Sequence, residues 1–503
     1  MGFNRRNFLT GLMAGGAVLA GNRLRALPQQ LNPVNETGLA HDQDRPEFHL
    51  LAPHNWMNDP NGPIWWRGQY HLFYQMNPGA ALWGDMHWGH AVSPDMIHWR
   101  HRPIALAPTP GGPDSAGCFT GSAVVRDGVP TLIYTGITPA PPEEATLRNG
   151  DQWYRETQLL ATAADSALEH WTKQAKPVVA TPPAGLHVLG FRDPCPWREA
   201  DGWYMVVGSG ERGGNGLALL YRSQDLRTWE YLHPLAEGNS KQAADPGGRG
   251  EMWECPDFFE VNGRWCLLHS QRGQVSWNTG EYDRTEHRFH ITRTGLLDQG
   301  SYYAPKSFRA RDGRRILWGW IPEARPKAEL VRAGWAGAMS LPRELKIGDR
   351  GQLEYAIARE AQSLRETGER VRVQAGQPYR RKLASLRLEA QIPVSLTGDA
   401  VTVRLSQGGQ AKWELTVDSK ANVIRVGEKN FPLPVKPWPQ PHLHLFFDGS
   451  VVESFIGGLE AVTNRVYGLK AGEAELEIEF AGKDGLEARL WPLKAISADR
   501  LTS

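Results

Sequence analysis

The stretch Ser93-Pro94-Asp95-Met96-Ile97-His98-Trp99 recurs along the chain and indicates how the chain folds. It returns as Ser223-Gln224-Asp225-Leu226-Arg227-Thr228-Trp229 and, in a weaker form, as Ala167-Leu168-Glu169-His170-Trp171. In each copy a turn precedes a tryptophan that can anchor the start of a strand. A turn and anchor spaced by roughly 60 to 70 residues are typical of the four-stranded blades of a β-propeller. Coincidental hairpins are the alternative explanation of three imperfect copies.

Short segments of alternating apolar and polar residues surround these repeats and are typical of β-strands. They lie at residues 70–74, 131–134, 203–207, 217–221, 265–269 and 316–320. Helical periodicity is nearly absent, which excludes architectures that need a crossover helix between parallel strands. About 300 residues would hold about five blades, so we predict an all-β chain in which residues 48–345 form a five-bladed β-propeller.

The remaining segment has a different pattern. A chain of 503 residues is long for a single core and favours two domains. Residues 353–365 have the best helical pattern, so residues 346–370 are predicted to be a helical linker. Strict alternation then returns and predicts a β-sandwich over residues 371–503, with a structural or sugar-contacting role.

The first residues are typical of an export signal. Arg5 and Arg6 precede an apolar run that ends at Ala20, and Leu24-Arg25-Ala26 resembles a cleavage site. The run is too short to span a bilayer, which needs roughly 20 apolar residues. We therefore expect a twin-arginine signal peptide at residues 1–26, a linker with little structure at residues 27–47, and a periplasmic or extracellular mature protein without membrane attachment.

Composition excludes several classes of function. The 56 basic and 55 acidic residues give a net charge of +1 with no long run of either sign, so nucleic acid is not expected as a partner. The four cysteines show no metal-ligand spacing, and we predict no metal and no cofactor. The 20 tryptophans would suit sugar binding, although many must serve the core.

Three carboxyl groups occur in proline-containing turns flanked by aromatic residues. They are Asp59 in Trp56-Met57-Asn58-Asp59-Pro60-Asn61-Gly62, Asp193 in Arg192-Asp193-Pro194, and Glu254 in Trp253-Glu254-Cys255-Pro256-Asp257. A retaining glycosidase needs two carboxyl groups, one to attack the anomeric carbon and one to protonate the leaving oxygen. Singly, each of the three is compatible with a plain turn, a surface ion pair or a solvated loop residue.

Together and in this order, these motifs resemble the signature of glycoside hydrolase family 32, the invertase, inulinase and levanase group. The resemblance covers nearly the whole chain after the signal and implies a five-bladed propeller followed by a β-sandwich. Further matching stretches are Phe73-Tyr74-Gln75, Trp83 with His87-Trp88-Gly89-His90-Ala91, Phe119-Thr120-Gly121-Ser122-Ala123, Tyr302-Tyr303-Ala304, Gly319-Trp320 and Gly334-Trp335-Ala336-Gly337.

The resemblance implies roles for the carboxyl groups: Asp59 as nucleophile, Glu254 as acid/base, and Asp193 as a fructose-binding stabiliser of the transition state. Arg192 would keep Asp193 ionised or contact the sugar. Two neighbouring anions would help to keep Glu254 protonated. The fructose pocket would be lined by Asn58, Gln75, Trp83, Phe119, Thr120, Tyr303 and Trp320.

The implied activity is release of terminal β-fructofuranosyl units from sucrose, inulin or levan through a covalent intermediate. Two departures from the family pattern bear on this. Thr120 replaces the more usual serine, and residues 270–280 lack the acidic and basic pair of plant-type invertases, which leaves sucrose preference open. The alternatives are a fructosyltransferase, an inactive fructan-binding protein and an arabinose-cleaving furanosidase. The oligomeric state is also left open.

Overall fold

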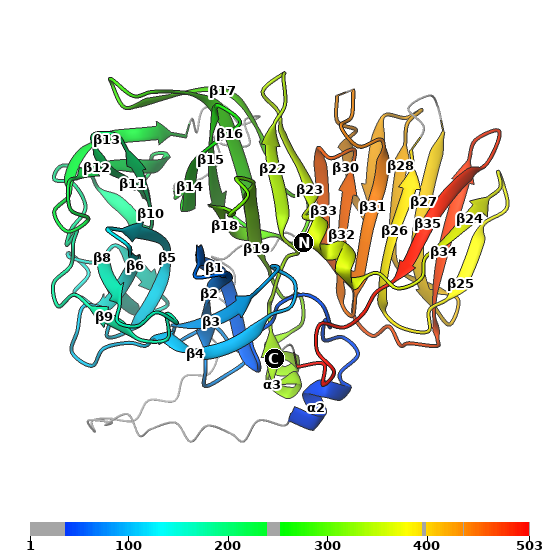
Figure 1. The fold of residues 1–503 in the computed structure, drawn as a ribbon, viewed down its shortest axis with the longest axis horizontal. Helices are drawn as coiled ribbons and strands as arrows, with labels where there is room; N and C mark the ends of the chain where they lie inside the picture. The colour runs from blue at the N-terminus through cyan, green and yellow to red at the C-terminus, as the bar shows by residue number, and fades with distance from the viewer. Residues whose placement is uncertain (1–35, 239–251, 395–398, 436, 502–503) are drawn as a thin grey trace.

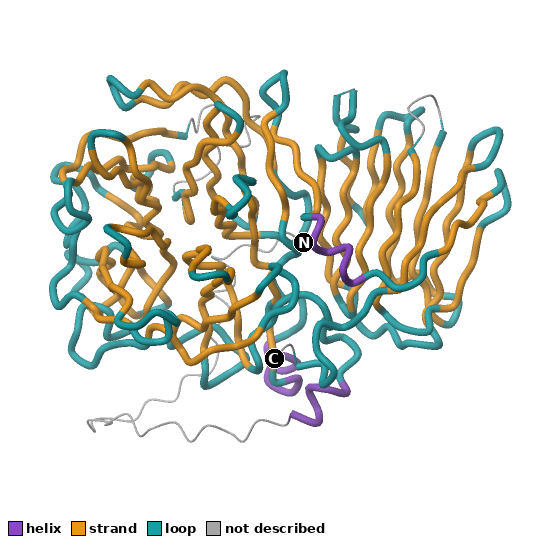
Figure 2. The backbone as a smooth tube through the Cα atoms, viewed as in Figure 1, coloured by secondary structure: helices purple, strands orange, loops and turns teal. Residues whose placement is uncertain are grey.

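A computed structural model describes residues 36–238, 252–394, 399–435 and 437–501. Strands account for most of these residues, and the helices are short (Figure 2). The expected signal peptide at residues 1–26 lies outside the described residues. No helix in the described part of the chain is long and apolar enough to cross a membrane.

The first part of the chain forms five sheets in chain order (Figure 1). The first sheet contains β1 (Asn55–Trp66), β2 (Gln69–Asn77), β3 (His87–Ser93) and β4 (Arg100–Leu106). The second contains β5 (Gly117–Arg126), β6 (Val129–Pro139), β7 (Leu147–Asn149), β8 (Gln152–Ala163) and β9 (Trp171–Lys173). The third contains β10 (Val188–Glu199), β11 (Gly202–Glu211), β12 (Gly216–Ser223) and β13 (Glu230–Glu237).

The fourth sheet contains β14 (Glu254–Val261), β15 (Arg264–Gln271), β16 (Gln274–Asp283) and β17 (Arg288–Leu296). The fifth contains β18 (Tyr303–Arg309), β19 (Arg315–Ile321), β21 (Ala338–Met339), β22 (Arg343–Ile347) and β23 (Leu353–Ile357). The short helix α3 (Lys327–Ala333) follows β19, and β20 (Trp335–Ala336) leaves this part of the chain to join the first sheet.

The five sheets close into a ring. The first strand of each sheet is innermost, so that β1, β5, β10, β14 and β18 contact one another in this order and β18 returns to β1. The short strand β20 also pairs in parallel with β1, with Trp335 opposite Asn55, and so ties the fifth blade to the first. This arrangement is a five-bladed β-propeller and confirms the predicted fold.

The repeated turn has the same place in successive blades, between the third and fourth strands. In the first blade the Asp95 carboxylate accepts the backbone N–H groups of Ile97 and His98, at 3.0 and 2.9 Å. Asp225 accepts two backbone N–H groups in the same way in the third blade. Met96 and Leu226 both have positive φ angles, 68° and 59°. The repeat is therefore a blade element and not a coincidence of hairpins.

The second domain is a sandwich of two six-stranded antiparallel sheets. One sheet contains β24 (Glu369–Val373), β26 (Arg387–Pro393), β31 (His442–Asp448), β32 (Val451–Ile456), β33 (Glu460–Arg465) and β35 (Leu486–Pro492). The other contains β25 (Tyr379–Lys382), β27 (Ala400–Gln407), β28 (Gln410–Asp418), β29 (Val423–Val426), β30 (Lys429–Pro432) and β34 (Ala474–Ala481). Alternate residues of the two sheets form a continuous apolar core. The sandwich lies beside the fifth blade (Figure 1).

The predicted helical linker is wrong in its central part. Leu353–Ile357 is strand β23, which pairs with β22 and extends the fifth blade beyond residue 345. Only Arg359–Leu364 is helical, as one short 3-10 segment. Leu353 and Tyr355 are buried at period two, so sheet pairing overrides the helical preference of this segment.

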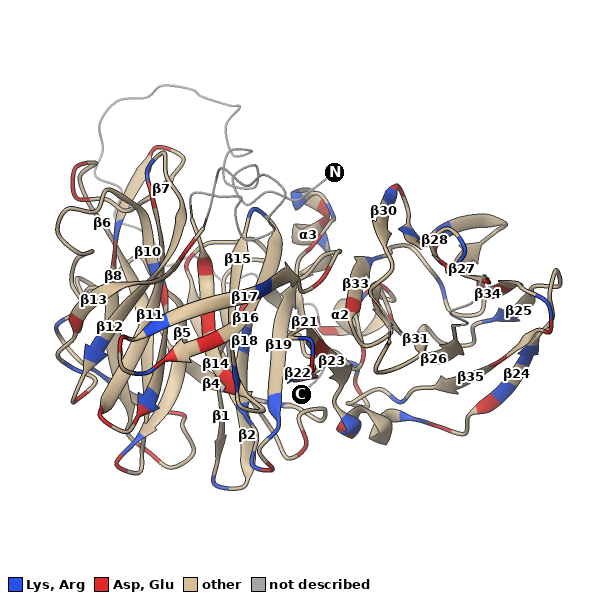
Figure 3. Cartoon of the chain, turned by 90° about the horizontal axis from the view of Figure 1, so that it is seen from above, with Lys and Arg blue, Asp and Glu red and all other residues tan. Residues whose placement is uncertain are grey.

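The segment before the propeller is also more ordered than expected. Residues Glu36–His41 form helix α2, within the predicted linker. The Arg45 side chain is almost fully buried and donates to the carbonyl oxygens of Ala52 and Pro53. Charged residues of both signs are interspersed over both domains (Figure 3), as the balanced composition predicts.

Candidate active site

All five inner strands are irregular at the same level of the ring. Their pairing registers shift between Met57 and Pro60, Cys118 and Gly121, Arg192 and Cys195, Glu254 and Asp257, and Tyr303 and Lys306. Four of these shifts include a proline, which cannot donate to the strand ladder. Bulges bend a strand and redirect its side chains. The local sequence thus turns one or two side chains of each blade toward the centre.

These side chains line one cavity of about 360 Å³. Every predicted site residue except Asn58 contributes to its wall: Asp59, Gln75, Trp83, Phe119, Thr120, Arg192, Asp193, Glu254, Tyr303 and Trp320. The chain brings these residues together from positions far apart in sequence. The volume suits a binding pocket for a small polar molecule.

Asp59 is held in a fixed orientation. Its side chain is 1% exposed, and its Oδ2 accepts the Thr120 hydroxyl at 2.6 Å. Its Oδ1 accepts the Asn58 amide at 3.0 Å, and that amide also donates to Gln75 at 2.6 Å. Asn58 was expected to line the sugar pocket; it is fully buried and is not among the residues that line the cavity. Its contacts therefore make it a residue that positions the Asp59 carboxylate.

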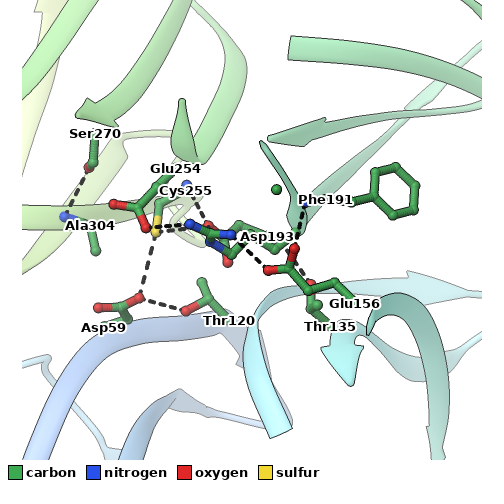
Figure 4. Close-up of polar contacts among 12 residues, drawn as sticks. Asp59, Thr120, Thr135, Glu156, Phe191, Asp193, Glu254, Cys255, Ser270 and Ala304 are labelled. Carbon is green, nitrogen blue, oxygen red and sulfur yellow. Dashed lines mark hydrogen bonds and ion pairs between the residues drawn. The ribbon is translucent and has the colours of Figure 1, made fainter. Parts of the chain in front are cut away.

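Asp193 lies close to Asp59 and has a positive φ angle of 66°. Its Oδ2 accepts the Cys255 backbone N–H at 2.7 Å. The Cys255 Sγ is 3.4 Å from Asp193 Oδ2 and 3.6 Å from Asp59 Oδ2, so the thiol lies between the two carboxylates (Figure 4). Burial, reinforced by the charges of Asp59 and Glu254, raises the Asp193 pKa to about 6 against the opposing effect of Arg192.

Arg192 connects Glu254 to a further buried carboxylate. Its Nη2 donates to Glu254 Oε1 at 2.8 Å and its Nη1 to Glu156 Oε1 at 2.7 Å. Its Nε is 3.9 Å from Asp193, so the expected pairing with Asp193 is the weakest of the three. The Tyr303 hydroxyl donates to Glu254 Oε2 at 2.5 Å. Both oxygens of Glu254 thus have a donor.

Aromatic rings form the apolar part of the wall. Trp83 and Phe119 make an edge contact with ring centroids 6.0 Å apart. Trp56 and Trp320 lie 5.7 Å apart, and both also line the cavity. Such surfaces fit the C–H faces of a sugar, while the carboxylates are placed to accept its hydroxyl groups.

The sequence analysis missed Glu156 and Cys255 as members of the site. Glu156 is fully buried on β8, where it also accepts the Phe191 backbone N–H at 2.8 Å. Glu156, Thr157 and Gln158 are consecutive polar residues that are all buried in β8. The sequence of this strand gives no signal for their burial, because it also contains polar residues toward its exposed end. Cys255 gave no separate signal, because a buried cysteine is common in any core.

A propeller whose central cavity gathers three buried carboxyl groups with aromatic walls is typical of a glycoside hydrolase. The family model described as "Glycosyl hydrolases family 32 N-terminal domain" matches residues 49–356, and that described as "Glycosyl hydrolases family 32 C terminal" matches residues 356–494. The chain belongs to glycoside hydrolase family 32, the β-fructofuranosidase family. The resemblance seen in the sequence motifs is confirmed.

Characterised relatives agree with this assignment. The chain is 38% identical to a sucrose-6-phosphate hydrolase of Escherichia coli over 452 residues, covering 84% of this chain and 89% of the relative. It is 35% identical to a raffinose invertase of Escherichia coli over 483 residues, covering 89% and 95%. The solved structure of a family 32 β-fructofuranosidase of Bombyx mori, 29% identical, superposes with a TM-score of 0.76 over 90% of this chain and 95% of that one.

Proposed function

We propose that this glycosidase releases terminal β-fructofuranosyl units, from sucrose or from the ends of fructans, with retention of configuration. The observation that carries the proposal is the meeting of Asp59, Asp193 and Glu254, from three blades, in one small cavity. The names of the relatives, a sucrose-6-phosphate hydrolase and a raffinose invertase, support a fructoside substrate.

In the first step Asp59 attacks the anomeric carbon of the fructosyl unit. The Thr120 and Asn58 hydrogen bonds fix the carboxylate for this attack, which limits the entropy lost in reaching the transition state. The transition state resembles an oxocarbenium ion, and the nearby Asp193 carboxylate stabilises its positive charge. Cys255 donates to Asp193 from its backbone and so holds this second carboxylate in place.

Glu254 protonates the leaving oxygen in the same step. Arg192 and Tyr303 each donate to this side chain and stabilise the carboxylate that remains after the proton has left. In the second step the ionised Glu254 removes a proton from water, which then displaces Asp59 from the fructosyl unit. In this proposal Asp59 is the nucleophile, Asp193 stabilises the transition state, and Glu254 acts first as the acid and then as the base.

Product analysis tests this proposal. We expect the purified protein to form equal amounts of glucose and fructose from sucrose, and to transfer fructose to added methanol as the β-anomer. Net inversion would contradict the covalent intermediate. Oligosaccharides in place of free fructose at high sucrose would identify a fructosyltransferase, and a folded protein that binds fructans without cleaving any would identify a binding protein.

We also propose that the protein is exported by the twin-arginine route. The support is the Arg5-Arg6 pair and the apolar run that follows it. Polymeric fructans and sucrose outside the cytoplasm would then be within its reach.

A further inference from the structure

One wall of the cavity is built against the sandwich domain. Gln299, Gly300 and Ser301 line the cavity just before Tyr303. The backbone N–H of Gln299 donates to Ala461 at 2.9 Å and that of Ser301 to Thr463 at 2.7 Å, both on β33. Gly300 approaches β33 so closely that an added Cβ would lie 1.9 Å from the Thr463 carbonyl oxygen.

A buried carboxylate fixes the start of this wall. Asp298 accepts the Thr463 backbone N–H at 2.9 Å and the Thr463 hydroxyl at 2.7 Å. It also pairs with the Arg343 guanidinium at 3.0 Å, and both side chains are fully buried. Residues 298–301 therefore keep the sandwich at a fixed position relative to the cavity.

The sandwich also places a side chain of its own at the cavity. Lys429, at the start of β30, lines the cavity together with residues of the propeller. Its Nζ donates to the Gln299 carbonyl oxygen at 3.0 Å. A lysine ammonium has three N–H donors, so this bond leaves the others for a ligand. Lys429 is exposed whereas Asp59, Asp193 and Glu254 are buried, which places Lys429 at the mouth and the carboxyl groups at the floor.

We propose that Lys429 is a specificity-determining residue that binds hydroxyl groups of the leaving sugar, so that the sandwich domain forms part of the leaving-group site. The inference rests on the proposed function. The fructosyl unit must reach the carboxyl groups at the floor, and therefore the leaving sugar lies at the mouth. An ammonium fixed by Gln299 donates charge-assisted hydrogen bonds to hydroxyl oxygens there. Lys429 has no part in the chemistry of the fructosyl unit.

The test compares two substrates in one set of variants. Sucrose has a leaving sugar, whereas methyl β-D-fructofuranoside has only methanol as its leaving group. We expect Lys429→Met to lower the ratio of kcat/KM for sucrose to kcat/KM for the methyl fructoside by about three- to tenfold, because an exposed charged hydrogen bond contributes less than a buried one. Lys429→Arg, which keeps a cationic donor, should retain most of the ratio.

Lys412→Met is the matched control, because Lys412 is an exposed lysine on β28 of the same sheet that does not line the cavity. This control should leave the ratio unchanged. An equal loss with both substrates in Lys429→Met would show that Lys429 acts only through the wall at Gln299, and no loss with either would show that it does not contact substrate. Both results overturn the inference. Failure of the wild-type protein to cleave either substrate would instead refute the proposed function.

Discussion

Replacement of Glu156 by Gln tests whether a buried carboxylate remote from the substrate positions Arg192. Glu156 uses one oxygen for Arg192 and the other for the Phe191 backbone N–H, at 2.7 and 2.8 Å. A glutamine has the same shape but only one acceptor oxygen. It can therefore satisfy one of these buried donors, while its NH₂ group faces the other.

The expected loss follows from this geometry. A buried donor left without its partner costs about 1–3 kcal/mol. Removal of one member of a buried ion pair costs about 3–5 kcal/mol when the other charge is left uncompensated. Arg192 keeps its hydrogen bond to Glu254 at 2.8 Å and lies 3.9 Å from the Asp193 carboxylate, so its charge keeps a partner. We therefore expect the free energy of unfolding to fall by about 2 kcal/mol, the cost of one unsatisfied buried donor. With Glu156 removed, Arg192 shifts toward Glu254, and kcat/KM should fall about tenfold.

The assay combines denaturant unfolding with a pH profile of kcat. Stronger pairing of Arg192 with Glu254 should move the basic limb of the profile, which the general acid sets, to lower pH. Glu389→Gln is a matched control, since Glu389 is a buried carboxylate of the sandwich that pairs with Arg365 at 2.6 Å. Both variants should lose stability, but only Glu156→Gln should change the profile. An unaltered profile and unaltered kcat/KM in Glu156→Gln would refute the argument that Glu156 positions Arg192.

Four further predictions follow from the site and the sequence. Asp59→Asn should abolish turnover of every β-fructoside. Glu254→Ala should lower the rate of sucrose hydrolysis about 10²- to 10⁴-fold and that of an activated fructoside less, and added azide should restore part of the rate. Identical responses of the two variants would show that the roles are misassigned. The Asp193 pKa is raised to about 6 in the folded state, so its contribution to the free energy of unfolding should fall as pH rises from about 4 to about 6. Asp193→Asn should remove this pH dependence of the free energy of unfolding in denaturant titrations, and it should also lower activity. Replacement of both Arg5 and Arg6 by lysine should stop export, measured as the share of the protein outside the cytoplasm after cell fractionation. Continued export would indicate the general secretory route. A chelator should leave hydrolysis intact; loss restored by a divalent metal would reveal a metal requirement.

Much of the site was predictable because its carboxyl groups lie in distinctive local motifs. Asp59, Asp193 and Glu254 each adjoin a proline-containing break in an inner strand, and these breaks are visible in the sequence. Glu156 has no such motif, since its role depends on an arginine from the next blade. The hydrogen bonds of Asn58 to Asp59 and Gln75 were likewise not predictable, because they depend on how β1 packs beside β2.

The sequence alone determined the all-β class, the blade repeat and the three carboxyl groups, because alternation, turns and prolines act over a few neighbouring residues. Only the tertiary structure decided which groups meet. Ring closure brings Cys255 between Asp59 and Asp193, and packing of the sandwich brings Lys429 to the cavity from a domain with no recognisable catalytic motif. These contacts join residues far apart in the chain, and their geometry depends on how whole sheets pack.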